Sequence, residues 1–464
     1  MTYSEAIQFL YSLRWFGAKF GLANTYKLAA LAGNPQKGLR FIHVAGTNGK
    51  GSTCAMLESI YRAAGLRVGL FTSPHLVAFG ERIQVNRRVI SARDIGRLVA
   101  EMRSLLETGW GTSACDASFI CSDTQTEKQG PESPHDAAEH PTFFEVVTIL
   151  ALRHFAEQEC DLVIWETGLG GRLDATNIVT PLVSVITNIQ YDHQKWLGET
   201  LASIAGEKAG IIKPGIPVIT AVEGDEALPV IVGTAHRQNA PLTILSPAET
   251  HRAPLDTLQL PLLGQHQRMN AAVAVATVRA LASQIPVSED TIHTGLSHVH
   301  WAGRLQLVAR SVGQKVLLDG AHNIGGAGIL AAAVNEYFPS AKLTLVLGIL
   351  RDKDWPCMCE ILAPLAERIL LVPVPSERSA TPQELAVACR CANPRAQVAE
   401  CGSLREALAS TTKDSFLTIA GSLYLIGEAM ELLHLSPAKA TDERSLNEWS
   451  GVPASAQPAV PSWR

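Results

Sequence analysis

A glycine-rich stretch between a short apolar strand and a helix carries the clearest chemical signal in this chain. Residues 41–53 read FIHVAGTNGKGST, so apolar residues run into glycines, a lysine and a serine. Glycines let backbone N–H groups approach phosphate oxygens, the lysine adds positive charge, and a serine hydroxyl can bind Mg²⁺. The start of the following helix adds the positive end of its dipole. We therefore predict a site that binds the phosphates of ATP.

The spacing departs from the general P-loop pattern, which has four residues between its glycines and Ser or Thr directly after the lysine. Here two residues separate Gly46 from Gly49, and Gly51 stands between Lys50 and Ser52. The alternative is a glycine-rich strand–helix turn that binds nothing. Apolar residues at helical spacing follow the loop and predict an amphipathic helix: Cys54, Leu57, Ile60, Tyr61 and Ala64.

Polar side chains follow other apolar strands at the point where each strand ends. Ser73 follows one strand, Glu166 ends a second, and Asp192 and His193 follow a third. The carboxyl ends of parallel strands are where open α/β sheets bind ligands. A carboxylate there could hold Mg²⁺, whereas the histidine could be a ligand, a base or a surface residue. Together with the phosphate loop these groups predict a Mg²⁺-dependent ATP site, and they leave the phosphate acceptor open.

Strand and helix patterns alternate along the chain, which predicts an α/β fold with mostly parallel sheets. We expect a P-loop parallel-sheet N-terminal ATPase domain over residues 1–298 and a smaller, Rossmann-like α/β C-terminal domain over residues 299–435. The expected strands are 39–45, 67–71, 162–166, 183–188 and 217–220 in the first series, and 316–319, 343–348, 369–374 and 416–421 in the second. The second series has no phosphate loop.

Two segments are rich in polar residues, proline and glycine and poor in apolar ones. We predict that residues 109–141 form a disordered surface insertion and that residues 436–464 form a flexible tail.

Composition excludes several classes of protein. The net charge is −5 over 464 residues and no block of lysine and arginine occurs, so we expect no nucleic-acid partner. No apolar run is long enough for a bilayer, and the N-terminus lacks a secretory pattern. The nine cysteines are scattered, which fits a reducing, cytoplasmic location. The pairs Cys357/Cys359 and Cys389/Cys391 have the wrong spacing for a zinc knuckle, so we expect structural thiols.

Taken together, the motifs resemble the folylpolyglutamate synthase/dihydrofolate synthase family, within the Mur-ligase-like amide ligases. The similarity runs in order from about Gly21 to Gly427, outside the insertion. The matching motifs are residues 43–52, 73–76, 166–177, 192–193, 196–198, 207–210, 301–304, 319–323, 352–354 and 421–422.

The resemblance implies a reaction in which ATP phosphorylates a pterin-linked carboxylate and the amino group of L-glutamate attacks the acyl phosphate. The acceptor would be dihydropteroate, a reduced folate or both, and the sequence does not separate a dihydrofolate synthase from a folylpolyglutamate synthase or a bifunctional enzyme. Phosphorylation gives the carboxylate a leaving group, and a positive, metal-rich site stabilises the charge that develops.

The resemblance also implies roles for particular residues. ATP would be bound by Asn48, Gly49, Lys50, Gly51, Ser52, Asn270, Arg304, Asp319 and His322. Two Mg²⁺ ions would be held by Ser52, Ser73, Glu166, His193 and Lys208, and the catalytic set would be Lys50, Glu166, His193 and Lys208. Lys208 matches a lysine that is carbamylated in the family, a modification that requires a neutral amine and hence a lowered pKa.

Pterin contacts would come from Leu22, Thr142, Phe143, Phe144, Glu145, Leu173, Asp174 and Ala175. The two phenylalanines could instead be plain core residues. Asn24 and Thr25 stand where the family often has a charged residue, and Gln194 and Lys195 separate His193 from Trp196 where an acidic residue often precedes the tryptophan.

Two rival interpretations remain. A Mur-type peptide ligase acting on a nucleotide sugar would need a further N-terminal domain, and about 40 residues precede the phosphate loop. A non-catalytic ATP-binding regulatory module would have lost Lys50, Glu166, His193 or Lys208, and all four are present. We expect a monomeric, cytoplasmic enzyme.

Overall fold

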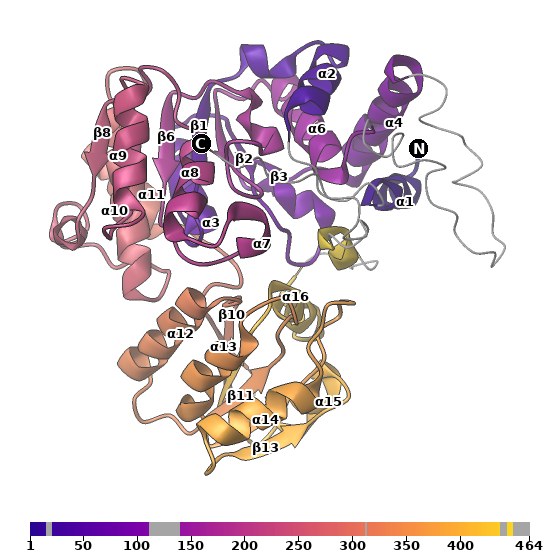
Figure 1. Cartoon of the computed structure of the whole chain (residues 1–464), viewed down its shortest axis with the longest axis vertical. Coiled ribbons are helices and arrows are strands. Elements are labelled where there is room, and N and C mark those ends of the chain that lie inside the picture. The colour runs from indigo at the N-terminus through magenta and orange to yellow at the C-terminus, as the bar shows by residue number, and fades with distance from the viewer. Residues whose placement is uncertain (15–20, 111–139, 311–312, 437–442, 449–464) are drawn as a thin grey trace.

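A computed structural model describes residues 1–14, 21–110, 140–310, 313–436 and 443–448. They form two α/β domains, the N-terminal one above the C-terminal one in Figure 1. The predicted fold class is confirmed. Most of the predicted insertion at 109–141 lies outside the described residues.

The N-terminal domain is built on an eight-stranded sheet with the order β4-β3-β2-β5-β1-β6-β7-β8. All pairings are parallel except those of β2 with β3 and β3 with β4. The strands are β1 Phe41–Ala45, β2 Val68–Phe71, β3 Ile83–Val85, β4 Arg88–Val89, β5 Leu162–Glu166, β6 Val183–Ile186, β7 Val218–Thr220 and β8 Leu242–Ile244.

Successive residues of the central strands point to opposite faces, as the two-residue period of a strand requires. Phe41, Val163 and Trp165 join one hydrophobic cluster, whereas Ile42 and Ile164 join another. Helices cover both faces: α1 Tyr3–Leu13, α2 Ala23–Leu31, α3 Lys50–Ala63, α4 Ala92–Gly109, α6 Phe143–Glu157, α7 Gln194–Leu197, α8 Leu201–Ala209, α9 Leu228–Arg237, α10 Gln265–Ala280 and α11 Glu289–Ser297.

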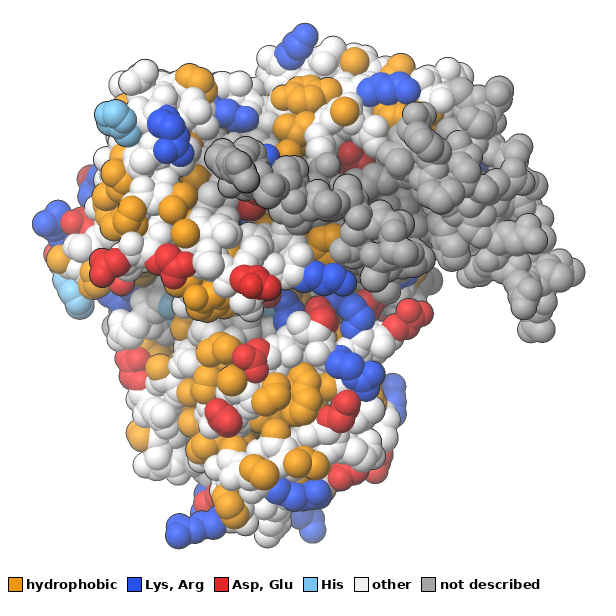
Figure 2. Space-filling model, in the orientation of Figure 1, with side chains coloured by type: hydrophobic (Ala, Val, Ile, Leu, Met, Phe, Trp, Pro, Cys, Tyr) orange, Lys and Arg blue, Asp and Glu red, His pale blue; other side chains and the backbone are white. Residues whose placement is uncertain are grey.

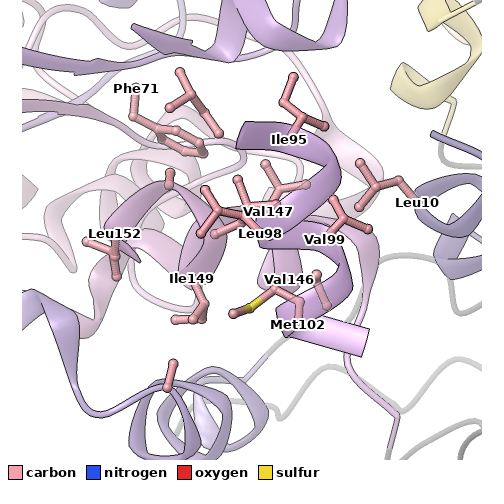
Figure 3. Close-up of a cluster of buried hydrophobic side chains, with 14 of the residues drawn as sticks. Leu10, Phe71, Ile95, Leu98, Val99, Met102, Val146, Val147, Ile149 and Leu152 are labelled. Atoms are coloured by element: carbon pink, nitrogen blue, oxygen red, sulfur yellow. The ribbon is translucent and has the colours of Figure 1, made fainter. Parts of the chain in front are cut away.

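The first cluster lies beneath α1, α2, α4 and α6, and Figure 3 shows part of it. Leu10 of α1 and Phe71 of β2 border the packing of α4 against α6. The labelled residues of these two helices are Ile95, Leu98, Val99, Met102, Val146, Val147, Ile149 and Leu152. This cluster fixes the start of α6, which lies at the functional site.

Helix α3, which follows the phosphate loop, is buried on all sides rather than amphipathic. Every residue from Ser52 to Tyr61 is buried, including Glu58 and Ser59, because α10 and α11 cover the face turned away from the sheet. Gly295 of α11 makes this packing possible, since a Cβ there would come within 2.5 Å of Ile60 Cα.

The C-terminal domain carries a six-stranded sheet with the order β13-β12-β11-β14-β10-β9, in which only β9 is antiparallel. The strands are β9 Gln306–Ala309, β10 Lys315–Asp319, β11 Leu343–Leu347, β12 Arg368–Leu371, β13 Gln397–Glu400 and β14 Phe416–Ala420. The helices are α12 Ile324–Tyr337, α13 Trp355–Leu362, α14 Pro382–Ala392, α15 Leu404–Ser410 and α16 Leu423–Leu432.

All nine predicted strands occur; that at 162–166 is matched at both ends, and the ends of the others shift by at most three residues. The structure adds β3, β4, β8, β9 and β13, which lie at or next to sheet edges. Four of these five contain exposed residues and lack a continuous apolar run, so the search for buried strands missed them. Cys359 and Cys389 lie together in the hydrophobic core of the C-terminal domain.

The prediction of a flexible tail from residue 436 is wrong for one stretch. Glu443–Asn447 forms a short 3₁₀ helix, η8, and Glu443, Leu446 and Asn447 are buried. Its polar side chains find partners on the N-terminal domain, which composition alone does not reveal.

No helix in the part of the chain that the structure describes is both long enough and apolar enough to cross a membrane. On the face shown in Figure 2, acidic and basic side chains of the described residues are interspersed rather than gathered into a band of one sign.

The close contact of α11 with α3 gives a stability prediction. Gly295→Ala would force a Cβ against the backbone of α3, and we expect it to lower the free energy of unfolding by about 1–3 kcal/mol. Gly328→Ala is the matched control, because Gly328 is exposed in α12 and a Cβ there would have nothing within 4 Å. We expect that control to be neutral or to stabilise by about 0.5–1 kcal/mol. Chemical denaturation measures both, and equal effects of the two variants would contradict this account of the contact.

Candidate active site

A cavity of about 600 Å³ lies between the two domains and is lined by residues of both. It brings together almost every residue that the sequence analysis assigned to a site. These are Asn48, Gly49, Lys50, Gly51, Ser52, Ser73, Thr142, Phe143, Phe144, Glu145, Glu166, Leu173, Asp174, Ala175, His193, Lys208, Asn270, Arg304, Asp319 and His322. Leu22 does not line the cavity; it packs against the first hydrophobic cluster instead.

The phosphate loop connects β1 to α3 in a conformation that depends on glycine. Gly49 has φ of 85° and precedes the first residue of α3, a left-handed conformation that glycine adopts without strain. A Cβ on Gly49 would lie 2.5 Å from Asn270 Oδ1 of α10. A Cβ on Gly51 would lie 2.9 Å from the ring of Trp301, in the segment joining the two domains. The loop is therefore packed from two sides.

The polar groups of the loop are held by neighbours. Lys50 Nζ donates to the carbonyl oxygens of Gly46 and Thr47, at 3.0 and 3.1 Å. The buried Ser52 hydroxyl accepts from Gln267 Nε2 at 3.2 Å, and Gln267 Oε1 accepts from Asn270 Nδ2 at 3.0 Å. Helix α10 thereby fixes the hydroxyl at the start of α3.

Glu166 ends β5 as a buried carboxylate beside the loop. Its Oε2 accepts the backbone N–H of Ser73 at 3.0 Å, and no described lysine, arginine or histidine pairs with it. Burial raises the pKa of Glu166 to about 7, although the positive charge of Lys50 acts in the opposite direction. A buried carboxylate without an ion-pair partner, in a cavity that Ser52 and Ser73 also line, fits a divalent cation.

No three histidine, cysteine or acidic side chains meet in the described part of the chain to form a metal centre by themselves. Hard cations such as Mg²⁺ are commonly completed by water and phosphate oxygens, so one carboxylate and hydroxyls fit this mode of binding.

Lys208 of α8 lies buried against the start of the phosphate loop. Its Nζ donates to the carbonyl oxygen of Gly46 at 2.8 Å. Burial, followed by the nearby charge of Lys50, lowers the pKa of Lys208 to about 7. A large share of this amine is therefore neutral near pH 7. The preceding residue, Glu207, forms an ion pair with Arg172 at 2.8 Å.

Asp192 joins the two domains. Its carboxylate accepts from Lys353 Nζ at 2.6 Å and from Asn323 Nδ2 at 3.0 Å, and both partners belong to the C-terminal domain. Burial alone would raise the pKa of Asp192, but the bond to His322 and the charges of His193 and Lys353 lower it well below its usual value.

His193 directly precedes α7 and has a left-handed conformation, with φ of 53°. Burial lowers its pKa more than the neighbouring Asp192 raises it, and Lys353 lowers it further. The imidazole is therefore neutral near pH 7 and can act as a metal ligand.

The remaining candidates for nucleotide binding from the C-terminal domain are also held in place by hydrogen bonds. Asp319, at the end of β10, accepts the backbone N–H groups of Leu305 and Ala321 at 2.8 and 2.9 Å. Arg304 Nη1 donates to the Gly320 carbonyl at 3.3 Å. Asn323 also bonds Asn48 of the phosphate loop at 3.2 Å, so the two domains meet at the loop itself.

Several residues expected to contact a pterin have structural contacts as well. Thr142 and Glu145 form a capping box at the start of α6, with Thr142 N donating to Glu145 Oε2 at 2.7 Å. Asp174 accepts the N–H groups of Gly168 and Leu169 at 3.0 and 2.8 Å. These three side chains hold the cavity wall in place.

The phenylalanines serve both the core and the cavity. Phe143 is 9% exposed and stacks near Phe79, and Phe144 lies against Phe71. Both also line the cavity, so core packing and cavity wall do not exclude one another here.

Sequence reasoning missed a set of arginines and the end of the described chain. The cavity is also lined by Arg14, Arg82, Arg378, Leu446, Asn447 and Glu448. Arg82 ends the short helix Phe79–Arg82, and Arg378 follows β12. None lies at the end of a predicted strand, and only folding brings them together.

A phosphate loop at the carboxyl edge of a mostly parallel sheet faces a second α/β domain across a cavity that contains the buried Glu166. This arrangement fits a nucleotide-dependent ligase of the Mur type. Residues 303–423 match the family model described as Mur ligase, glutamate ligase domain.

Comparison with known proteins narrows this class. The chain is 36% identical to dihydrofolate synthase/folylpolyglutamate synthase of Bacillus subtilis, over 93% of this chain and 99% of that protein. A solved folylpolyglutamate synthase from Thermotoga maritima superposes with a TM-score of 0.76 at 30% identity, covering 96% of this chain and 99% of that one. E. coli FolC in complex with DHPP and ADP gives a TM-score of 0.78 at 29% identity, with 94% and 98% covered.

The chain belongs to the folylpolyglutamate synthase/dihydrofolate synthase family. It is accordingly an ATP-dependent ligase, and the resemblance drawn from the sequence motifs is confirmed.

The Asp192–Lys353 contact gives a prediction about how the domains stay together. Asp192→Asn would leave Lys353, whose side chain is 9% exposed, without its carboxylate. Breaking a buried pair in this way costs about 3–5 kcal/mol, so we expect the domains to separate. Small-angle scattering would record a larger radius of gyration than for the wild type. Glu249→Gln, which breaks a more exposed ion pair with Arg252, is the control, and an unchanged radius in Asp192→Asn would contradict the prediction.

Proposed function

We propose that this enzyme adds L-glutamate to a pterin-linked carboxylate through an acyl-phosphate intermediate, releasing ADP and phosphate. The carboxylate attacks the γ-phosphorus of ATP, the bond from that phosphorus to the ADP oxygen breaks, and an acyl phosphate forms. The amino group of glutamate then attacks the acyl carbon, phosphate leaves, and the amine loses a proton.

The observation that carries this proposal is the composition of the cavity. The phosphate loop, the buried Glu166 and Lys208, and the apolar wall formed by Phe143 and Phe144 all line one cavity. Phosphoryl transfer depends mainly on positioning and on neutralising charge, and Lys50 and the loop N–H groups are placed for both tasks.

Mg²⁺ fits the residues present. Ser52, Ser73 and Glu166 would hold one ion, and His193 with a modified Lys208 would hold a second. Bound there, Mg²⁺ would neutralise charge on the phosphates and polarise them. The protein groups do the rest: α10 holds the Ser52 hydroxyl in place, and the Ser73 N–H orients the Glu166 carboxylate.

Lys208 is proposed to be carbamylated. Its neutral amine attacks CO₂, an N–C bond forms and a proton leaves, which turns a buried cation into an anion. Two observations support this step: burial lowers the pKa of Lys208 to about 7, and the side chain faces the same cavity as His193.

The acceptor is proposed to be dihydropteroate, a reduced folate or both. The B. subtilis relative carries both activities in its name, and the E. coli structure holds DHPP. The residues proposed to contact the pterin are Thr142, Phe143, Phe144, Glu145, Leu173, Asp174 and Ala175. Leu22 is proposed only as a support behind that wall. A cytoplasmic, monomeric enzyme with domains near 1–298 and 299–435 remains our prediction.

Turnover with alternative acceptors tests the reaction. With Mg²⁺-ATP and L-glutamate, we expect ADP release that depends on 7,8-dihydropteroate, on tetrahydrofolate or on both. Dependence on 7,8-dihydropteroate alone would assign a dihydrofolate synthase, and dependence on tetrahydrofolate alone would assign a polyglutamate-chain enzyme. Glu166→Gln should reduce turnover by about 10²-fold or more, since charge stabilisation is lost. Absence of turnover on both acceptors, with ATP still bound, would refute the proposal.

A substitution at Lys208 tests the carbamate. We expect Lys208→Ala to abolish ligation while ATP binding, measured by calorimetry, stays within about threefold of the wild type, because the phosphate loop and Lys50 remain. Lys213→Ala is the control, since that lysine lies outside the cavity lining and donates to the Asn177 carbonyl. Full activity of Lys208→Ala without an added carboxylate would exclude the carbamate role.

A further inference from the structure

The last described residues, 443–448, lie between the two domains. In Figure 1 they form the short yellow helix between the upper domain and α16. Arg444 keeps an ion pair with Glu431 of α16, while the neighbouring residues pack against the N-terminal domain. Glu443 Oε2 accepts from Tyr3 Oη at 2.8 Å and from Phe79 N at 2.7 Å. His75 Nε2 bonds the Glu443 carbonyl at 2.9 Å. Glu443 therefore anchors the segment firmly.

The two residues at the end of this segment meet three arginines. Asn447 Oδ1 accepts from Arg82 Nη2 at 2.5 Å. Glu448 Oε2 pairs with Arg378 Nε at 2.9 Å, and the Glu448 carbonyl accepts from Arg14 Nε at 3.2 Å. All five residues line the cavity between the domains. An amide, a carboxylate and a carbonyl thus lie where three guanidinium groups converge.

This arrangement leaves charge and hydrogen bonding incomplete. Arg82 is 3% exposed, yet both of its hydrogen-bond partners are neutral: Asn447 Oδ1 accepts from Nη2, and His75 Nδ1 accepts from Nε at 2.9 Å. No described carboxylate forms an ion pair with Arg82. Buried Glu448 Oε1 has no hydrogen-bond partner among the described residues. A guanidinium binds a carboxylate more strongly than it binds an amide, and a buried acceptor without a donor is costly. Arg378 already pairs with Glu448 and, at 3.1 Å, with Asp352. A ligand carboxylate would therefore improve on the amide of Asn447 at Arg82 and on the backbone carbonyl of Glu448 at Arg14.

We propose that Arg14, Arg82 and Arg378 form a subsite for the carboxylates of a glutamyl group, and that Asn447 and Glu448 occupy it as an intramolecular placeholder. The inference rests on the proposed function, which supplies two substrates with such carboxylates: free L-glutamate and the glutamyl end of a folate.

The position of the arginines supports this assignment. Arg14 and Arg82 belong to the N-terminal domain and Arg378 to the C-terminal one, so the subsite exists only where the domains meet. Guanidinium groups bind carboxylates through paired, directional hydrogen bonds. Glu448 carries the same side-chain carboxylate as the substrate. While it occupies the subsite, only the fraction of molecules with the segment withdrawn can bind the ligand.

The full chain carrying Asn447→Ala and Glu448→Ala tests the placeholder, since the Glu443 anchor stays intact. We expect the KM for L-glutamate or for tetrahydrofolate to fall by about threefold or more, with the KM for ATP within about twofold of the wild type. A fall for L-glutamate alone assigns the subsite to the incoming amino acid, and a fall for tetrahydrofolate alone assigns it to the acceptor. Unchanged or higher values for both would overturn the inference.

Two further variants serve as a fallback and as a control for this test. Glu448→Gln keeps the shape of the side chain and removes its charge. This variant replaces the double variant if that one fails to fold, and we expect a smaller fall in the same KM. Glu223→Gln removes a carboxylate from an exposed residue outside the cavity and should change neither value.

A binding measurement separates this inference from the proposed reaction. If the wild type binds ATP but turns over neither acceptor, the proposed function fails. Calorimetry with L-glutamate and with tetrahydrofolate then still decides the inference. Tighter binding of either compound to the double variant than to the wild type supports the placeholder, and equal or weaker binding of both overturns it.

Discussion

The position of β1 between β5 and β6 is the constraint on which the site depends. Val44 lies opposite Glu166 on one side and Ala45 opposite Ile186 on the other. This register places the phosphate loop, the Glu166 carboxylate and the segment leading to Asp192 at one edge of the sheet. A shift by one residue would turn Glu166 to the opposite face. The buried apolar residues on both faces of the central strands therefore do more than stabilise the domain, because they hold the polar groups in register.

Burial sets the electrostatics at that edge. Glu166 and Lys208 both have pKa values displaced toward neutrality, because water is excluded around them. Such groups are unfavourable in an isolated domain and become useful when a charged ligand enters. The C-terminal domain adds to this exclusion of water: its Lys353 and Arg304 line the same cavity. Lys353 and Asn323 bond residues of the N-terminal domain. Docking of the domains and preparation of the site are thus the same physical event.

Much of this arrangement could be predicted from the sequence, for a physical reason. The strands that end in Glu166 and in the phosphate loop are continuous apolar runs, and parallel sheets bind ligands where such strands end. Edge strands such as β8 and β13 are half exposed, so their sequences carry no comparable pattern. The buried segment at Glu443 was missed because polar residues give no sign of the partners they will meet. Arg82 and Arg378 lie about three hundred residues apart and converge only through the docking of two domains. Leu22 was expected at the site from the family resemblance, whereas its side chain packs against the first hydrophobic cluster.

The contact between Gly51 and Trp301 has an evolutionary consequence. The loop cannot accept a side chain at Gly51 unless the indole moves, and the indole belongs to the segment that joins the domains. The guanidinium of Arg87 lies 5.5 Å from the centre of the same ring, which holds its other side. A larger residue at position 51 therefore requires a smaller residue at position 301, whereas the reverse does not hold. The loop glycine thus depends, over evolution, on a residue that lies outside the loop.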